Sequence, residues 1–209
     1  MRIAVLGATG AVGRHVVQYA LDADYEVVAY IRNASKMTVH HPDLLVVEGS
    51  LSDLARLEKA LHDTVAVVSA LGVSHRTPDK QPSQQLPVIL EAMQKAGVSR
   101  YIGLSSGAAV NMPGDRKPLA AKIMGHILNT FRHTAVEDKK RELDTLCQQS
   151  TVTWTLARPT RLIGDTLSQG YRATAHRPRR LWTSRADVAH FLVQQVSDNQ
   201  WDNQAPFIS

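Results

Sequence analysis

Residues 7–13 are Gly7-Ala8-Thr9-Gly10-Ala11-Val12-Gly13, and this turn decides the fold of the chain. An apolar, β-branched run precedes it at 2–6, and apolar residues recur at helical spacing after it, so the order predicts strand, tight turn and helix. A pyrophosphate can approach the backbone N–H groups at such a helix start only where side chains are absent. Gly7 is expected to make the turn, Gly10 to allow the close approach and Gly13 to let the helix pack on the strand. The spacing G-x-x-G-x-x-G therefore predicts dinucleotide binding.

The turn after the second expected strand, residues 26–31, indicates which dinucleotide is bound. An NAD-selective site usually has Asp or Glu at the end of this strand, where the acid binds the ribose 2′-hydroxyl. This chain instead continues with Arg32-Asn33-Ala34-Ser35-Lys36. A guanidinium can hold a 2′-phosphate through two hydrogen bonds, and Lys adds a second positive charge. The turn favours NADP(H) over NAD(H); the alternative is an ordinary solvated turn.

Short apolar runs continue to alternate with helical patterns along the chain. The expected strands are 2–6, 26–31, 44–47, 65–70 and 101–104, and the expected helices follow the glycine turn and cover about 53–61, 86–95, 119–131, 135–149 and 187–196. Segments 73–83 and 110–116 are expected to be loops because they contain Pro, Gly and polar residues. The alternation predicts an α/β fold, a Rossmann-like doubly wound parallel sheet with helices on both faces. Ligands of such sheets bind at the carboxyl ends of the strands.

Composition bounds the architecture and the cellular setting. The 209 residues are 44% hydrophobic without a break in composition, so residues 1–209 are expected to form one domain with one sizeable core. There is no apolar stretch of membrane-spanning length, and the chain begins with a strand rather than a signal-type segment. We expect a cytoplasmic protein, either monomer or homodimer, with no membrane partner.

Metal and disulfide chemistry find little support in the sequence. The single Cys147 cannot form an internal disulfide, and we interpret it as structural or incidental. His40-His41 and the other histidines lack the spacing of metal ligands, so we predict no metal.

The charge balance raises the question of a nucleic-acid partner. The net charge is +5, and much of the cation excess lies in Arg172, His176, Arg177, Arg179, Arg180 and Arg185. Few aromatic residues accompany these cations, so the stacking surface of a single-strand binder is missing. The segment 172–185 is better explained as a basic loop near an anionic cofactor or substrate, and nucleic acid is not expected as a partner.

Several motifs together resemble a known family. They are GATGAVG at 7–13, the Arg32 turn, Ser105-Ser106, DKKREL at 138–143, WTLARP at 154–159 and IGD at 163–165. The chain resembles, over nearly its whole length, the atypical short-chain dehydrogenase/reductase group of NAD(P)H-binding proteins. Within that group it is similar to the biliverdin-IXβ reductase/flavin reductase branch and to NmrA-like proteins. The group contains flavin and quinone reductases, sugar-nucleotide relatives and non-catalytic redox sensors.

The resemblance implies a set of site residues. The expected cofactor-binding residues are Gly7, Thr9, Gly10, Ala11, Val12, Gly13, Arg32, Lys36, Ser50, Leu51, Ala70, Leu71, Gly72, Ser105 and Pro159. Ser50 is a departure, because the family commonly has Asp there, near the adenine. Pro159 is expected to form, with Thr160 and Arg161, the turn over the nicotinamide.

Two residues are candidates for a catalytic role. By the expected topology Ser106 emerges beside the nicotinamide, where it either binds a substrate oxygen or the carboxamide, or only caps the strand end. The resemblance places Lys139 in the substrate pocket; the alternative is one charge among many on a solvated helix face. Arg158 either pairs with an acid at the sheet edge or touches substrate.

The chain lacks the proton relay of ordinary short-chain dehydrogenases, a Tyr four residues before a Lys. No Tyr occurs between Tyr101 and Tyr171. Carbonyl reduction would need another acid, whereas a flavin or quinone takes hydride at its ring and draws a proton from water. We therefore expect an NADPH-dependent oxidoreductase acting on a flavin, quinone or similar small conjugated acceptor. The alternative is a non-catalytic NADP(H)-binding redox sensor of NmrA-like type. A sugar-nucleotide epimerase or dehydratase is disfavoured, because the chain after residue 150 is short for a substrate subdomain.

Overall fold

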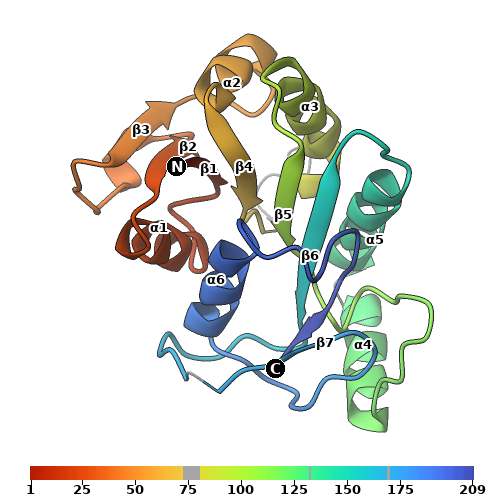
Figure 1. The fold of residues 1–209 in the computed structure, drawn as a ribbon. Helices are drawn as coiled ribbons and strands as arrows, with labels where there is room; N and C mark the ends of the chain where they lie inside the picture. The colour runs from red at the N-terminus through yellow and green to blue at the C-terminus, as the bar shows by residue number, and fades with distance from the viewer. Residues whose placement is uncertain (73–80, 132, 169) are drawn as a thin grey trace.

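A computed structural model describes residues 1–72, 81–131, 133–168 and 170–209, apart from the side chains at 124, 128, 129 and 131 (Figure 1). Within these residues one sheet of eight strands runs in the order β3-β2-β1-β4-β5-β6-β8-β7. The strands are β1 Arg2–Leu6, β2 Glu26–Ile31, β3 Leu44–Glu48, β4 Thr64–Ser69, β5 Arg100–Leu104, β6 Thr153–Pro159, β7 Ala173–Thr174 and β8 Phe207–Ile208. The helices are α1 Gly13–Asp22, α2 Leu54–Leu61, α3 Pro82–Lys95, α4 Leu119–Phe131, α5 His133–Cys147 and α6 Arg185–Gln194, with a short 3-10 turn at Ala34–Lys36.

Helices cover both faces of the sheet, and the alternation of side chains along β1 shows why. Ile3 and Val5 pack into one core with α1 and α6, whereas Ala4 and Leu6 pack into the other core with residues of α2, α3 and α5. Successive side chains of a strand point to opposite faces. A strand buried on both faces must therefore be apolar at every position, which explains the unbroken apolar run.

The order of the strands creates a crevice next to β1. The chain passes from β1 to β2 and β3 on one side and returns to β4, β5 and β6 on the other. Loops that leave the carboxyl ends of β1 and β4 consequently diverge, and ligands of such sheets bind in the gap between them. The expected Rossmann-like α/β fold is confirmed.

Three local features differ from the sequence-based expectation. Helix α3 begins at Pro82, which stands at its first position, and Gln81 with Gln84 forms a capping box, so the helix includes the end of the expected loop 73–83. Residues 73–80 lie outside the described part of the chain. Strand β7 pairs antiparallel with β8, so the sheet is mostly, not wholly, parallel. Cys147 is exposed at the end of α5, which does not support a role in the core.

Gly13 holds α1 against the turn that follows β1. A Cβ atom on Gly13 would lie 2.0 Å from the carbonyl oxygen of Gly7 and 2.9 Å from Cα of Ala8. Both of these atoms belong to backbone, so the clash cannot be relieved by a side-chain rotation. The close packing of α1 on the strand therefore requires glycine here.

We predict that Gly13→Ala lowers the free energy of unfolding by about 2 kcal/mol, because the added methyl overpacks the turn. Gly72→Ala serves as the control, since a Cβ there meets no atom of the described residues within 4 Å, and its effect should stay within about 0.5 kcal/mol. Urea unfolding monitored by circular dichroism measures both. Equal stability of the two variants would show that the turn can shift to accept the methyl group.

Candidate functional site

A cavity of about 420 Å³ opens at the carboxyl ends of β1, β2 and β4. It is lined by Gly7, Thr9, Gly10, Tyr30, Ile31, Arg32, Asn33, Lys36, Gly49, Leu51, Ala70, Leu71 and Gly72. The structure thus brings nine of the expected cofactor-binding residues into one cavity from four loops far apart in the sequence. Ala11, Val12, Gly13 and Ser50 are adjacent in sequence to lining residues but do not line the cavity themselves.

The start of α1 lies next to this cavity and has unused hydrogen-bond donors. Gly7 has φ +77°, a conformation that favours glycine, and a Cβ there would lie 2.9 Å from the carbonyl oxygen of Ala70. No side chain caps α1, and in the described chain the N–H groups of Ala11 and Val12 donate to no acceptor. Free N–H groups and the positive end of the helix dipole form an anion site.

Arg32 and Lys36 supply two exposed cations at the same cavity. Neither side chain has an ion pair or hydrogen bond within the described residues. The turn between them is shaped by Asn33, whose Oδ1 accepts a hydrogen bond from the backbone N–H of Ser35 at 2.9 Å. The guanidinium and the ammonium are therefore available to a ligand.

Glu48 is an acid that contacts the turn between Arg32 and Lys36, and the sequence analysis missed it. Its Oε2 accepts a hydrogen bond from the backbone N–H of Ala34 at 2.8 Å. Glu48 ends β3, and the register pairs it with Ile31 at the end of β2. The contact between Glu48 and the Arg32 turn depends on this register, which is a tertiary feature. The one sequence signal for the contact is the position of Glu48 at the end of a strand. A carboxylate at this place can accept a hydrogen bond from a ribose 2′-hydroxyl but repels a 2′-phosphate.

Tyr30 forms a second wall that the sequence did not indicate. Its hydroxyl donates to the carbonyl oxygen of Ser50 at 2.9 Å, and a Cβ on Gly49 would lie 2.2 Å from that hydroxyl. Desolvation, followed by the charge of Asp53, raises the pKa of Tyr30, so the phenol remains a donor at neutral pH. The Ser50 hydroxyl lies 2.7 Å from that of Ser52, so the Ser50 side chain pairs within its own turn while its carbonyl holds Tyr30.

The adjacent ends of β5 and β6 carry two buried hydroxyls without partners. They belong to Ser105 and Thr160, and neither oxygen makes a hydrogen bond within the described residues. Backbone hydrogen bonds of 2.8 Å, from Ser105 to Ala157 and from Gly107 to Pro159, hold these strand ends together. Unsatisfied buried polar atoms are costly. Their presence at this sheet edge is what a site for a polar ligand group requires.

Ser106 and Pro159 frame the same strand ends. Ser106 Oγ lies 3.4 Å from the backbone N–H of Ala109, a long hydrogen bond of the kind expected for a weak cap. Pro159 is buried at the end of β6 and pairs with Ile208. Neither residue lines the cavity at β1.

Lys139 lies in a buried polar network on the α5 face of the sheet. Its Nζ donates to the carbonyl oxygen of Leu104 and to Oε2 of Glu142, each at 2.7 Å, and the residue is only 6% exposed. Glu142 also accepts a hydrogen bond from the Tyr101 hydroxyl at 3.2 Å. Burial, followed by the Glu142 charge, raises the pKa of Tyr101 well above its usual value, so the phenol stays protonated. The interpretation of Lys139 as a charge on a solvated face is therefore wrong.

Arg158 pairs with an acid, as one of its two interpretations requires. It is fully buried, and its guanidinium donates two hydrogen bonds to the Asp115 carboxylate, at 2.7 and 3.0 Å. The guanidinium also stacks over the ring of Phe207, 4.0 Å from the ring centroid. Arg158 thus anchors the loop between Ser106 and α4 to the sheet.

Metal-binding clusters and membrane-spanning helices are both absent from the described part of the chain. No group of three or more His, Cys, Asp or Glu residues there is placed to hold a metal ion. None of the described helices is long and apolar enough to span a membrane.

The sheet order and the crevice define a Rossmann-like protein. Residues 7–199 match the model of a family described as NAD(P)H-binding, so the chain belongs to this NAD(P)H-binding family.

Named relatives fit this family. A (4-alkanoyl-5-oxo-2,5-dihydrofuran-3-yl)methyl phosphate reductase of Streptomyces griseus is 30% identical over 79% of this chain and 50% of its own length. The photosystem II assembly factor Ycf39 of Synechocystis is 29% identical over 54% of this chain and 36% of its own length. The chain thus spans half or less of the length of both relatives.

Solved structures support the fold over the whole chain. The anaerobillin reductase ChuY of Escherichia coli O157:H7 superposes with a TM-score of 0.79 at 20% identity, covering 100% of this chain and 96% of that one. A short-chain dehydrogenase/reductase of Veillonella parvula in complex with NADP superposes with a TM-score of 0.77 at 19% identity, covering 100% and 94%.

We predict that Lys139→Met lowers the free energy of unfolding by about 3–5 kcal/mol, because it leaves the buried Glu142 carboxylate without its partner. Lys140→Met is the matched control: Lys140 also pairs with a Glu three positions away on α5, at 2.8 Å, but on the exposed surface. Its unfolding midpoint in urea should remain close to that of the parent. Similar midpoints for both variants would contradict the structural importance of the buried pair.

Proposed function

We propose that the protein is an NADPH-dependent oxidoreductase that transfers hydride to a flavin, a quinone or a similar small conjugated acceptor. The observation that carries the proposal is the cavity that joins the glycine turn to Arg32 and Lys36. Its free N–H groups suit a pyrophosphate, and its two free cations suit a 2′-phosphate. Membership of an NAD(P)H-binding family supports the same reading.

In this proposal the dinucleotide extends from β2 to β6 along the carboxyl ends of the strands. The pyrophosphate region lies at residues 7–13, the adenosine phosphate at Arg32 and Lys36, and the adenine near residues 49–51. Residues 70–72 line the ribose path toward the nicotinamide. The unpartnered hydroxyls of Ser105 and Thr160 are suited to the carboxamide, so the residues present fit the cofactor at both ends.

The protein's part in the chemistry is positioning. When bound, the nicotinamide supplies the hydride. Ser106 stands at the exit of β5, where its hydroxyl can hydrogen-bond the carboxamide or an acceptor oxygen. Lys139 acts as a positioning residue, because its ammonium holds the carbonyl of Leu104 directly before Ser105. A conjugated ring can take its proton from water, so the missing Tyr is no obstacle.

The names of similar proteins support reduction without identifying the acceptor. Both the Streptomyces griseus relative and ChuY are named as reductases. A second function is favoured by a different observation. Ycf39 is named as an assembly factor, and the absent Tyr is equally compatible with a dinucleotide-binding protein that has no turnover. The competing proposal is a redox-sensing or regulatory protein.

We predict that Arg32→Ala weakens NADPH binding about 10- to 100-fold, the loss expected for hydrogen bonds to a charged group. NADH affinity should change by less than about twofold, because NADH has no 2′-phosphate to lose a contact with Arg32. Fluorescence titration of both cofactors measures the effect. Equal losses for the two cofactors would contradict the 2′-phosphate role.

Glu48→Gln is the companion variant for that titration. If the carboxylate repels a 2′-phosphate, its neutralisation strengthens NADPH binding and leaves NADH unchanged. If the carboxylate instead binds the ribose hydroxyls, the variant weakens NADH, and the preference for NADP(H) would be withdrawn.

The experiment that tests the function follows NADPH oxidation with FMN, dichlorophenolindophenol and a small quinone as acceptors. We predict saturable turnover with at least one acceptor and its loss in Gly10→Val, whose side chain would fill the cavity next to the helix start. Thermal unfolding verifies that Gly10→Val is folded, so its loss of turnover reports the lost cofactor site. Tight NADPH binding without turnover on any acceptor would reject the reductase and favour the sensor.

A further inference from the structure

Charge is distributed unevenly along this chain. Residues 116–136 and 166–186 contain no Asp or Glu, although the chain has 19 acidic residues. The same two segments contain nine of the 24 Lys and Arg residues, so the rest of the chain carries a net negative charge. The basic character of the protein therefore resides entirely in these two segments.

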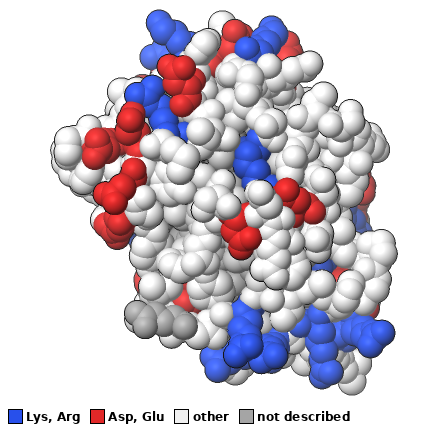
Figure 2. Space-filling view, in the orientation of Figure 1, with Lys and Arg blue, Asp and Glu red and all other residues white. Residues whose placement is uncertain are grey.

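The fold brings the two segments together. The backbone N–H of Arg116 donates to the carbonyl oxygen of His176 at 2.7 Å, and the His176 ring contacts Gly114. Pro118, directly before α4, lines a surface groove together with Arg177, Pro178, Arg179, Arg180, Leu181 and Trp182. Figure 2 shows the result as a gathering of Lys and Arg at the end of the molecule where Figure 1 draws α4, without Asp or Glu beside it.

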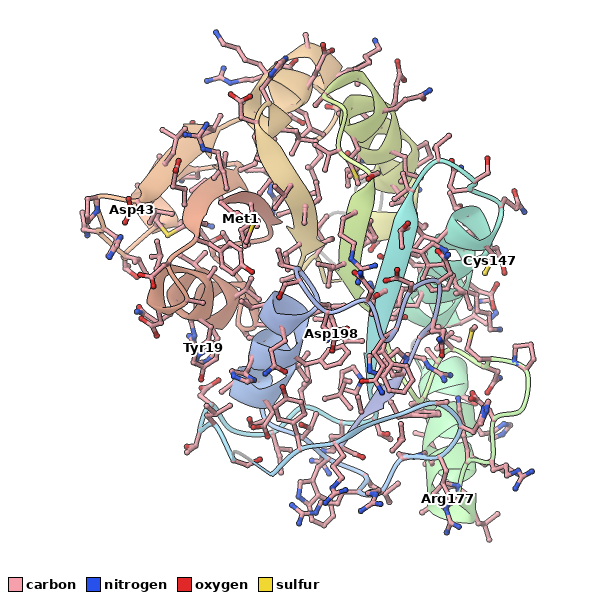
Figure 3. All side chains as sticks on the ribbon, viewed as in Figure 1. Met1, Tyr19, Asp43, Cys147, Arg177 and Asp198 are labelled. Atoms are coloured by element: carbon pink, nitrogen blue, oxygen red, sulfur yellow. The ribbon has the colours of Figure 1, made fainter. Side chains whose placement is uncertain are left out.

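The cations of this region are available to a partner. Arg177, Arg179 and Arg180 are exposed, and none of their side chains forms an ion pair or hydrogen bond within the described residues. Figure 3 labels Arg177 beside the lower end of α4. Lys117 is not available in this way. Its Nζ donates to the carbonyl oxygen of Val110 within the loop before α4, and desolvation lowers its pKa to about 8.

Large apolar side chains are exposed on α4 and, in the groove with these cations, at Trp182. Leu119, Ile123 and Ile127 recur at intervals of four along α4 and are 73%, 52% and 50% exposed, and Trp182 is 53% exposed. Side chains at this spacing share one face of a helix. An aliphatic stripe of this kind is costly in water unless a partner covers it.

We propose that this surface binds anionic lipid membranes peripherally. We define the α4 surface as Leu119, Ile123, Ile127, Arg177, Arg179, Arg180 and Trp182. Exposed Leu and Ile on one face of α4, with unpaired arginines and an exposed Trp on the segment that meets the chain directly before this helix, supply the groups that interfacial binding requires. The apolar groups enter the headgroup region and the guanidinium groups pair with lipid phosphates.

Other occupants account for only part of this surface. A nucleic acid would use the arginines but has no use for an aliphatic stripe, and Trp182 alone is a poor stacking platform. In a two-fold dimer the same patch meets itself, so the unpaired arginines of both copies would be brought close together without an acid in either segment. An anionic bilayer satisfies both the charge and the apolar face. The expectation of no membrane partner concerned segments that span a membrane. Peripheral binding needs no such segment, because the protein lies on the membrane surface.

The experiment is flotation of the full chain with phosphatidylcholine vesicles and with vesicles that also contain phosphatidylglycerol. We expect binding only to the anionic vesicles, reduced by salt. The triple variant Arg177→Gln, Arg179→Gln, Arg180→Gln should bind at least about 20-fold more weakly, since each cation near an anionic surface contributes about a fivefold gain. The variant Ile123→Ser, Ile127→Ser should lose binding by about tenfold or more, because it removes the inserted apolar groups.

A matched control carries the same loss of charge at the opposite end of the molecule. Arg56→Gln, Lys59→Gln, Lys95→Gln changes exposed residues of α2 and α3 and should float like the parent. NADPH titration and thermal unfolding verify that every variant is folded, and they keep this test independent of the proposed reductase activity.

Several results would overturn the proposal. Equal flotation with both vesicle types, or no flotation at all, excludes an anionic membrane. Undiminished binding by the serine variant shows surface adsorption through charge alone. Arginine-dependent binding to duplex DNA without flotation assigns the surface to nucleic acid, and a concentration-dependent dimer that the serine variant abolishes assigns it to a second copy.

Discussion

The backbone contact between the first residue of α1 and the end of β1 determines where every functional element can lie. Gly13 packs against the carbonyl of Gly7 more closely than any side chain permits, and Gly7 packs against the loop after β4, where a Cβ would lie 2.9 Å from the carbonyl oxygen of Ala70. These contacts bring a helix start, two strand ends and a loop within a few ångströms of one another. The proposed anion site depends on that proximity, because the free N–H groups of α1 lie beside the cavity only when the helix begins directly on the turn.

Two buried charges hold helices and loops in place at the ends of β5 and β6, as the glycine contacts do at the end of β1. Lys139 ties α5 to the last carbonyl of β5, and Arg158 ties the loop before α4 to β6 and β8. Each charge has a carboxylate partner, so its desolvation is compensated. The two networks flank Ser105, Ser106 and Pro159. They fix the strand ends while leaving the hydroxyls of Ser105 and Thr160 without partners, a combination suited to a polar ligand rather than to stability.

The cavity at β1 and the α4 surface lie in different parts of the molecule, and we propose a separate function for each. The loop from Ser106 to α4 connects them; Arg158 of β6 anchors that loop to the sheet, and Lys117 braces it internally through the carbonyl of Val110. The anchored loop presents α4 with its apolar side outward instead of letting it fold back on the sheet. If the acceptor is a lipid-soluble quinone, membrane docking through α4 would place the protein where that acceptor is found; if it is water-soluble, docking serves location alone.

The sequence by itself determined the fold and one end of the site, because the signals there are local. Periodicities of two and 3.6 residues distinguish strands from helices, and the glycine spacing of the turn, with Arg32 and Lys36 after the second strand, follows from chemistry within a few residues. Only the tertiary structure decided the rest. Glu48 reaches the Arg32 turn through strand register, and Tyr30 covers Gly49 through packing. Lys139, one charge within a run of charges, is buried because α5 packs the face that carries Lys139 and Glu142 against the end of β5. Contacts between residues far apart in the chain depend on how elements pack, and no local pattern contains that information.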